Sequence, residues 1–337
     1  MPSMPRAVLR RSFALTLAAA GVFGVALVSV EHVEAQSAGV LPQSTHLPAS
    51  TRAMALGDAY QMGSGHADAV FYHPALLSRA SGFGLDVQRW SAEASSVAAS
   101  AAVGWFGGNV GIGLRSTQFG STLAGLQTMS TQDPLFVASS VPVSERVATL
   151  GYSRDFYLGL DLGVTVDLVD QRVGSQIHGV TLFDIGVSRS VGPLVAGLTV
   201  HDIGEKPIID TGSAPARYTL GVGQYGRPLG PLDFGFAAQL GVDQDDEFTW
   251  GGGVEFGYWP VQGRTFVARL GVQNVPDGSE ASPVTAGFAF WGDDLTLEWA
   301  MRPFSGADDG GTHRFGIRFR YALGPRLMRQ PPSPPQT

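Results

Sequence analysis

The chain has 337 residues, 44% of them hydrophobic, so it holds enough apolar material for one large domain or two ordinary ones and is not expected to be disordered. Only 15% of the residues are charged, against roughly a quarter in average domains, and 45 are glycine, which favours closely packed strands. A net charge of −7 with Lys206 as the only lysine argues against a nucleic-acid surface, and the absence of cysteine excludes disulfides, thiolate metal sites, cysteine nucleophiles and a lipidated cysteine anchor.

The first 35 residues have the pattern of an export signal. Arginines between positions 6 and 11 precede the apolar run Phe13 to Val30, and Val33-Glu34-Ala35 offers a small-residue cleavage site before Gln36. An uncleaved anchor helix is one alternative, because about eighteen apolar residues can just span a bilayer. A twin-arginine signal at Arg10-Arg11 is another, although that route carries folded cargo. We predict a signal peptide at residues 1–35 that is cleaved on export.

After a mixed segment at residues 36–82, the chain is a succession of alternating stretches broken by Gly, Pro, Asp and Asn. We count about fourteen strands, the even number expected of a bacterial single-chain barrel. The predicted strands are Phe83–Ser91, Ser95–Trp105, Asn109–Phe119, Arg146–Ser153, Tyr157–Asp170, Gly179–Arg189, Pro193–Asp202, Ala216–Tyr225, Leu232–Val242, Phe248–Tyr258, Thr265–Asn274, Val284–Trp291, Leu295–Arg302 and Thr312–Tyr321. They predict an all-β fold, an antiparallel transmembrane β-barrel over residues 83–321.

The stretch Leu158 to Asp170 raises the question of what surrounds this barrel. Side chains of one parity are apolar: Leu158, Leu160, Leu162, Val164, Val166 and Leu168. Those of the other parity are mostly small or charged: Gly159, Asp161, Gly163, Thr165, Asp167 and Val169. Strand side chains have period two, so one face is apolar. In a soluble sheet that face would cover a protein core, whereas in an outer-membrane barrel it faces lipid and the polar face lines the lumen.

The connection lengths favour the membrane barrel. The even-numbered connections are short: Phe106–Gly108, Arg154–Phe156, Ser190–Gly192, Gly226–Pro231, Trp259–Gly263 and Gly292–Asp294. Most odd-numbered ones are longer, above all Gly120–Glu145, His201–Pro215 and Pro303–Gly311, while the first and ninth are short exceptions. Outer-membrane barrels have tight periplasmic turns and longer outer loops, so the alternation predicts a protein of the bacterial outer membrane.

The last strand predicts a charged lumen. Arg314, Arg318 and Arg320 share one parity, and Glu298, Asp161 and Asp167 supply carboxylates of the same inward parity. Aromatic residues near strand ends fit the interfacial girdles of such barrels: Trp90, Trp105, Tyr258, Trp259 and Trp291. The proline-rich residues 322–337 predict a disordered periplasmic tail.

Between signal and barrel stands the sequence RAMALGDAYQMGSGHADAVFYHPALL, Arg52 to Leu77. It resembles the N-terminal segment of the PorV/PorQ and FadL-like outer-membrane proteins, and the resemblance continues in FDIGVSR at Phe183, GLTVHDIG at Gly197, APARYTLGVG at Ala214 and THRFGIRFRY at Thr312. The resemblance covers nearly all of the mature chain. It implies a fourteen-stranded barrel with residues 36–82 folded inside the lumen as a plug.

Within this segment the chain has His73-Pro74-Ala75 where the family usually has Asn-Pro-Ala. Asn is a strong helix N-cap and Pro suits the first helical position, whereas His caps less well. Either other contacts hold the turn, or His73 has gained a polar partner; we favour a packed plug residue over a ligand-binding one. For Arg52, Asp58 and Asp68 we favour plug-to-wall salt bridges over substrate contacts, because charges in a narrow lumen must be paired.

Catalytic and metal signatures are weak. GVGQYG at Gly221 has the spacing of a dinucleotide fingerprint, but it sits in a strand pattern and Arg227-Pro228 follows where a helix should begin. There is no Gly-x-Ser-x-Gly elbow, and His201-Asp202 ends a strand, so an exposed hydrolase site is a minor alternative. The acidic stretch 243–247 could bind calcium, although a solvated hairpin tip is favoured. We expect a non-enzymatic protein without cofactor, and the scattered histidines predict no metal site.

Two functions remain open. The PorV/PorQ resemblance, which the motif wording favours, implies a partner for secreted cargo proteins or other components of a type IX-like secretion apparatus. Its contact patch would be the apolar residues of the long loop: Leu126, Met129, Leu135, Phe136 and Val137. The FadL-like alternative implies a channel for a hydrophobic small molecule, a long-chain fatty acid or an aromatic hydrocarbon. It would need an apolar pocket above the plug, and its exit would be a plug shift or a wall gap at Gly251-Gly252-Gly253.

Overall fold

The structure is a computed structural model that describes residues 43–45, 47–60, 65–90, 94–119, 143–173, 176–204, 216–230, 232–242, 248–261, 264–275, 281–292, 294–303 and 311–320. The chain divides into two units, Met1–Ser37 and Ala38–Thr337. The predicted signal peptide and the predicted tail at residues 322–337 fall outside the described ranges.

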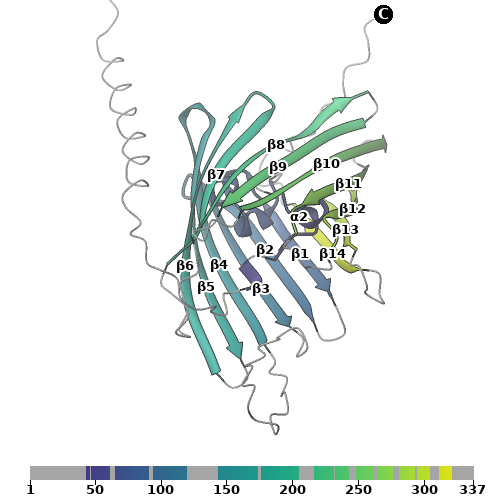
Figure 1. The fold of residues 1–337 in the computed structure, drawn as a ribbon. Helices are drawn as coiled ribbons and strands as arrows, with labels where there is room; N and C mark the ends of the chain where they lie inside the picture. Colours follow the sequence, from purple (N-terminus) through teal and green to yellow (C-terminus); the bar gives the residue numbers. More distant parts are fainter. Residues whose placement is uncertain are drawn as a thin grey trace, which may run out of the picture. The chain divides into compact units, whose positions relative to one another are not determined.

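Within the described residues, fourteen antiparallel strands form one closed barrel (Figure 1). Each strand pairs with its neighbours in sequence, and β1 pairs with β14 to close the ring. The strands are β1 Gly82–Arg89, β2 Ser95–Trp105, β3 Gly108–Phe119, β4 Val143–Phe156, β5 Leu160–Val173, β6 Gln176–Val191, β7 Leu194–Gly204, β8 Arg217–Leu229, β9 Leu232–Val242, β10 Phe248–Val261, β11 Arg264–Gln273, β12 Val284–Trp291, β13 Leu295–Arg302 and β14 Thr312–Phe319. The predicted fourteen-stranded barrel is confirmed.

Several connections are shorter or shifted relative to the prediction, and the fourth and fifth show how. β4 continues through Phe156, which pairs with Leu160, and the turn is Tyr157–Gly159 rather than Arg154–Phe156. The reason is conformational, because Leu158 and Gly159 both have positive φ, of 69°, and a left-handed pair of residues reverses the chain tightly. The fifth connection, expected to span about eight residues, consists only of positions 174 and 175, so the length alternation is weaker than predicted.

The outer surface of the barrel is apolar. Leu150 on β4 and Leu168 on β5 are 57% and 56% exposed, whereas Asp161 on β5 is 2% exposed and Glu298 on β13 is 4% exposed. Large exposed apolar side chains occur on every strand of the ring. Because a barrel has only one interior, the apolar parity must face the surrounding lipid and the polar parity must face the lumen.

One of the aromatic residues assigned to the interface faces inward instead. Trp105 and Tyr258 are exposed on the outer surface, but Trp291 has the inward parity of β12 and packs near Arg52, His66 and Arg320. Its girdle assignment was therefore wrong. Position at a strand end does not decide which side of the wall a side chain occupies; strand parity does.

The described residues of the range 43–81, which we call the inner segment, lie against the inward faces of the strands (Figure 1). Its short helices are η1 Gln43–Thr45, α2 Thr51–Ala55, η2 Ala67–Phe71 and η3 Pro74–Arg79. α2 contacts β11–β14, η2 contacts β1–β4 and η3 contacts β3–β6. Residues along this segment are completely buried, among them Ala53, Leu56, Tyr60 and Leu77.

No helix in the described part of the chain is both long and apolar enough to cross a bilayer.

The lipid-facing assignment can be tested at β5. Val164→Arg places a charge on the outer surface within the strand, and we expect it to lower the free energy of unfolding by about 2–4 kcal/mol. Leu158→Arg, in the turn that precedes the strand, should cost about 0–1 kcal/mol because it lies near the interface. The measurement is urea unfolding in phospholipid vesicles followed by tryptophan fluorescence. Equal losses for the two variants would contradict the assignment.

Candidate functional site

A series of buried ion pairs begins on α2 and runs along the inner face of the barrel wall. Arg52 Nη2 lies 2.9 Å from Glu255 Oε1 on β10, and Glu255 Oε2 lies 2.8 Å from Arg269 Nε on β11. Arg269 Nη1 in turn lies 2.8 Å from Glu298 Oε1 on β13. Glu255 and Arg269 face each other directly in the β10–β11 register. Positive and negative side chains thus alternate along this series of ion pairs.

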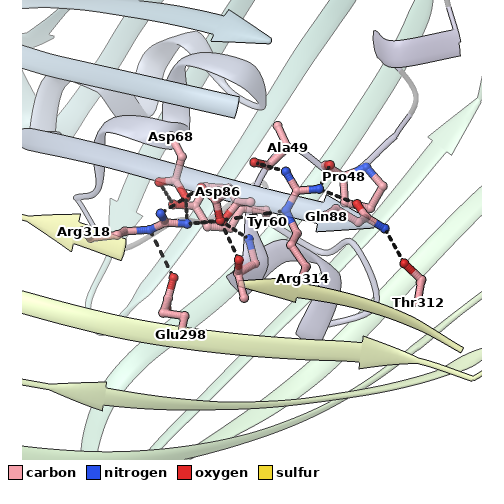
Figure 2. A network of polar contacts seen from close by, with 12 residues as sticks. Pro48, Ala49, Tyr60, Asp68, Asp86, Gln88, Glu298, Thr312, Arg314 and Arg318 are labelled. Carbon is pink, nitrogen blue, oxygen red and sulfur yellow. Dashed lines mark hydrogen bonds and ion pairs between the residues drawn. The ribbon is translucent and has the colours of Figure 1, made fainter. Parts of the chain in front are cut away.

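Arg318 on β14 continues this series of ion pairs and connects it to the inner segment again. Its guanidinium group contacts Glu298 at 3.2 Å, Asp68 of η2 at 2.9 Å and Asp86 of β1 at 2.9 Å (Figure 2). Arg318 also donates a hydrogen bond to Ser50 Oγ at 2.9 Å. One side chain therefore joins the two strands that close the barrel to two parts of the inner segment.

A second arginine of β14 holds the chain just before α2. Arg314 donates hydrogen bonds to the carbonyl oxygens of Pro48 and Ala49, at 2.6 and 2.7 Å (Figure 2). Thr51 donates two further bonds, from its backbone N and its Oγ1, to Asp86 Oδ1 at 2.7 and 2.6 Å. The N-terminal part of the inner segment is thus bound to the β1–β14 seam.

The ion-pair network is balanced in charge and almost completely buried. It contains four arginines, Arg52, Arg269, Arg314 and Arg318, and four carboxylates, Asp68, Asp86, Glu255 and Glu298. Burying a charge is costly unless it is paired and hydrogen-bonded, so this balance is what permits eight charges in a filled lumen. Arg52 and Asp68 are inner-segment members paired with the wall.

The other half of the inner segment is attached mainly by backbone carbonyl groups and apolar packing. Asn109 Nδ2 of β3 lies within 2.8–3.1 Å of the carbonyl oxygens of Leu77, Ser78 and Ala80, at the C-terminal end of η3. Unpaired carbonyls at a helix end need such donors. Arg79 adds an ion pair with Asp161 on β5, at 2.5 Å. An apolar cluster also holds this half against the wall. It consists of Val70, Leu76 and Leu77 with Ala102 of β2, together with Ala67, Ala69 and Ala80.

At His73-Pro74 the chain starts a short helix without a side-chain cap. Pro74 is the first residue of η3, and His73 precedes it in an extended conformation with no capping hydrogen bond. Neither ring nitrogen of His73 has a hydrogen-bond partner among the described residues. Burial lowers the pKa of His73 to about 3, so the ring is neutral. The turn is held by other contacts, including Ser153 Oγ, which donates to the Ala75 carbonyl at 2.9 Å.

The glycines of β10 form a seat for the inner segment instead of a gap in the wall. A Cβ at Gly251 would lie 1.9 Å from the Gly57 carbonyl oxygen, and one at Gly253 would lie 2.7 Å from Leu56 Cα. β10 meanwhile pairs in continuous register with both β9 and β11 through this stretch. The hypothesis of a wall gap at Gly251-Gly252-Gly253 is therefore wrong; missing side chains here allow backbone to touch backbone.

Two small cavities, of about 20 and 30 Å³, lie between the inner segment and the wall. They share five lining residues, Thr45, Phe71, Arg115, His201 and Arg217, so we treat them as two lobes of one polar chamber. The chamber lies toward the end of the barrel from which the connections 120–142, 205–215 and 243–247 emerge. The FadL-like hypothesis predicts an apolar pocket at this place, whereas the lining is rich in charged and hydroxyl groups.

A β-bulge brings two consecutive residues of β7 to this chamber. The β6–β7 register shifts between Phe183 and Ile185, and Asp202 has a positive φ of 60°. Asp202 N donates to Asp184 Oδ1 at 2.9 Å, and His201 Nδ1 lies 3.2 Å from Asp184 Oδ2. Regular alternation would turn one of the pair outward; the extra residue turns both inward.

The remaining carboxylates of the chamber differ in how they are satisfied. Asp167 on β5 accepts a hydrogen bond from Thr149 Oγ1. Asp58 Oδ1, on the inner segment, has no hydrogen-bond partner among the described residues, and neither has Asp202 Oδ2. Burial raises the pKa of Asp58 to about 6, an effect that Arg217 and Arg115 oppose. The expected salt bridge of Asp58 is therefore not among the ion pairs of the described residues, unlike those of Arg52 and Asp68.

The other candidates from the sequence are distributed as follows. Arg320 lies at the end of β14, with Nη2 3.1 Å from His66 Nε2 and the guanidinium over the Trp291 ring. The apolar loop residues Leu126, Met129, Leu135, Phe136 and Val137, and the acidic stretch 243–247, lie outside the described ranges. In the part that is described, no group of three or more His, Asp or Glu side chains is arranged to hold a metal ion.

The sequence reasoning missed several charged residues that the lumen brings together: Asp86, Arg115, Asp184, Arg217, Glu255 and Arg269. Their signal was present, since each is an isolated charge on a strand whose other parity is apolar. Their partners could not be read from the pattern, because cross-strand register depends on the turns.

No protein-family model matches the sequence, and none of the curated proteins matches it either. Among solved structures, the fold is similar to "TodX deltaS2S3 mutant monoaromatic hydrocarbon channel", with 14% identity over 80% of this chain and 96% of that one and a TM-score of 0.47. It is also similar to a Pseudomonas aeruginosa FadL homologue, with 10% identity, coverage of 81% and 99%, and a TM-score of 0.45. It is also similar to the CymD monoaromatic hydrocarbon channel, with 9% identity over 76% of this chain and 93% of that one and a TM-score of 0.45. Such values assign neither a family nor a substrate.

The ion-pair network predicts a large effect for Arg269→Met. The substitution leaves Glu255 and Glu298 buried without this partner, and we expect the free energy of unfolding to fall by about 3–5 kcal/mol. Arg172→Met is the matched control, because Arg172 and Asp170 are half exposed and 3.7 Å apart. Such a pair contributes about 0–1 kcal/mol. Equilibrium unfolding in urea measures both values, and a small loss for Arg269→Met would show that the network does not stabilise the fold.

The glycine seat predicts that a single methyl group displaces the inner segment. In Gly271→Ala the new Cβ would lie 2.1 Å from Gly57 N and 2.4 Å from the Leu56 carbonyl carbon, both backbone atoms. We expect a loss of about 1–3 kcal/mol and faster trypsin cleavage after Arg52 in the folded barrel. Gly179→Ala, where the nearest atom is 3.9 Å away, is the control. Unchanged cleavage in Gly271→Ala would refute the close seat.

Proposed function

We propose that this protein is a non-enzymatic transport barrel of the bacterial outer membrane and that its inner segment acts as a plug. The observation that carries the proposal is the contrast between the two faces of one wall. The outside is apolar and exposed, as a lipid-spanning surface must be, while the inside is polar and occupied. Side chains alone fill the interior of a barrel of about eight strands, whereas a fourteen-stranded barrel has a wider lumen. A separate buried segment that occupies this lumen indicates a closure.

The attachment of the segment supports a closure that opens. Its N-terminal part is fixed by ion pairs and hydrogen bonds to β10–β14 and β1, whereas η3 is fixed by carbonyl capping and apolar packing on β2–β6. Polar contacts are exchangeable for water, because a group that leaves its partner regains a hydrogen bond once water enters the opened lumen. Movement of residues 47–60 away from the β1–β14 seam is therefore the opening step that we propose.

A disulfide tether tests this step, and the natural chain has no cysteine to interfere. A Cβ at Gly316 lies 3.1 Å from Thr51 Cβ, so Thr51→Cys with Gly316→Cys needs only a small shift to reach disulfide geometry. We expect the oxidised double variant to lose ion conductance in planar bilayers and to regain it on reduction. If the natural chain and the reduced variant both fail to conduct any ion or solute, the transport proposal falls.

The matched control is a tether within the wall. Gly84 on β1 faces Ser100 on β2, and a Cβ at Gly84 would lie 2.9 Å from Ser100 Oγ. Gly84→Cys with Ser100→Cys joins two strands without holding the inner segment, so oxidation should leave conductance unchanged. Conductance that survives complete formation of the Thr51–Gly316 tether would contradict the plug role.

The solute of such a channel has two candidate classes. The sequence resemblance to FadL-like proteins supports a hydrophobic small molecule, such as a fatty acid or an aromatic hydrocarbon. The polar lining of the described chamber supports a small polar solute instead. Uptake of a labelled fatty acid and of toluene by cells with and without the gene decides whether the hydrophobic class is transported.

The secretion role implied by the PorV/PorQ resemblance would be carried by residues 123–141. Its support is the apolar character of that stretch, from Leu126 to Val137, and nothing in the described barrel adds to it. Capture of secreted proteins on the intact barrel, compared with a variant in which Leu135, Phe136 and Val137 are replaced by Ser, tests this second role. Equal capture by the two proteins would exclude the loop as the contact.

A further inference from the structure

The polar chamber differs from the ion-pair network in its charge balance. Among the described residues, four carboxyl groups line it, those of Asp58, Asp167, Asp184 and Asp202, against the two guanidinium groups of Arg115 and Arg217. If all four carboxyl groups are ionised, they outnumber the guanidinium groups by two. The network beneath is neutral. Because buried charge must be compensated, the chamber needs a counterion or bound protons.

One of the two guanidinium groups of the chamber, that of Arg115, has other contacts. Arg115 Nη1 donates to the carbonyl oxygens of Ser44 and Leu47, and its guanidinium lies 5.0 Å from the centre of the Phe71 ring. The hydrogen bond to Leu47 is long, at 3.4 Å, but both acceptors belong to the inner segment. Arg115 therefore positions that segment as well as facing the chamber.

Beside the open donor Nε of Arg115, the chamber has several side-chain oxygens that could still accept a hydrogen bond. Asp202 is 5% exposed, it lines the chamber, and its Oδ2 has no hydrogen-bond partner among the described residues. Asp58 Oδ1 and Gln239 Oε1, which line the second lobe, also have no hydrogen-bond partner among the described residues. Asp184, by contrast, is satisfied by Asp202 N and His201. A group that carries positive charge and N–H donors matches these acceptors.

The size of the chamber restricts the guest. A water-sized site needs about 10–15 Å³ of such volume, so lobes of about 20 and 30 Å³ hold one or two particles of that size each. A guest the size of water, positively charged and rich in N–H donors is ammonium or the protonated amino group of a primary amine.

We propose that the polar chamber binds a small monovalent cation of the ammonium type and makes the long-loop end of the lumen selective for cations. This proposal deepens the proposed transport function by naming a solute class. Its claim of cation selectivity rests on that function, whereas its claim of cation binding does not. Rings of carboxylates confer cation selectivity on channels in general. The same lining disfavours a hydrocarbon at this level of the lumen, because polar groups would lose water without gaining partners.

Binding is tested on the full-length folded barrel without any need for transport. The unfolding midpoint in detergent is measured in ammonium chloride and in tetramethylammonium chloride at equal ionic strength. Tetramethylammonium has the same charge but is larger and has no N–H group. We expect the midpoint to rise with ammonium until it saturates, and not with tetramethylammonium. Equal midpoints in the two salts would overturn the proposal.

Asp202→Asn and Asp58→Asn identify the site, and each should reduce or abolish the ammonium-specific shift. Asp170→Asn is the matched control, since this carboxylate is half exposed and paired with Arg172. Electrophoretic migration of the unheated barrel confirms that each variant folds. If Asp202→Asn stabilises the barrel equally in both salts and the natural chain shows no salt difference, the chamber holds protons instead of a cation and the proposal is wrong.

Selectivity is measured as the zero-current potential across a planar bilayer in a tenfold gradient of ammonium chloride. We expect the natural channel to pass ammonium in preference to chloride and the preference to fall toward one in Asp202→Asn. Open channels without cation preference would overturn the selectivity claim. The absence of any current, together with an ammonium-specific stability shift, would instead contradict the transport function and leave the binding site in place.

Discussion

The pairing of charge inside the barrel is the constraint on which the rest depends. A closed wall that is apolar outside has no freedom to expose its polar groups to bulk water, so every inward charge needs a partner within the lumen. Arg318 and Arg269 meet this requirement by linking β1, β10, β11, β13 and β14 to one another and to the inner segment. The same interactions that keep the wall charges paired also hold the segment that fills the lumen.

The two ends of the inner segment solve the problem of attachment differently. Around α2, glycines at positions 253 and 271 admit the backbone of Leu56 and Gly57 directly against the wall, and ion pairs surround the contact. Around η3, Asn109 satisfies carbonyl oxygens that would otherwise be orphaned. The polar chamber occupies the remaining space, where charge is in excess and acceptors are open, and this imbalance sets it apart as a place for a guest.

Sequence alone predicted the barrel because lipid on one side of a strand and a polar lumen on the other require opposite residue types at alternate positions. The stretch from Leu160 to Val169 shows both, with apolar side chains on one parity and mostly small or charged ones on the other. It placed Glu298, Arg314 and Arg318 on inward parity for the same reason. It could not predict that Glu255 faces Arg269, since register depends on turn geometry, nor that a bulge turns both His201 and Asp202 inward. The prediction for Trp291 is wrong because position at a strand end does not determine which side of the wall a side chain faces. The prediction for the β10 glycines is wrong because a missing side chain is compatible with a gap in the wall and also with a close backbone contact.

The β1–β14 seam has a consequence for how the molecule is made. Asp86 lies on the first strand and Arg318 on the last, and both bind residues that precede β1 in the chain. The last strand of the described barrel thus carries groups that bind the residues preceding the first strand. If the ring closed with the residues before β1 still outside, Arg318 would lack Asp68 and Asp86 would lack Thr51. During biogenesis the inner segment therefore has to enter the lumen before β1 pairs with β14, or together with that pairing.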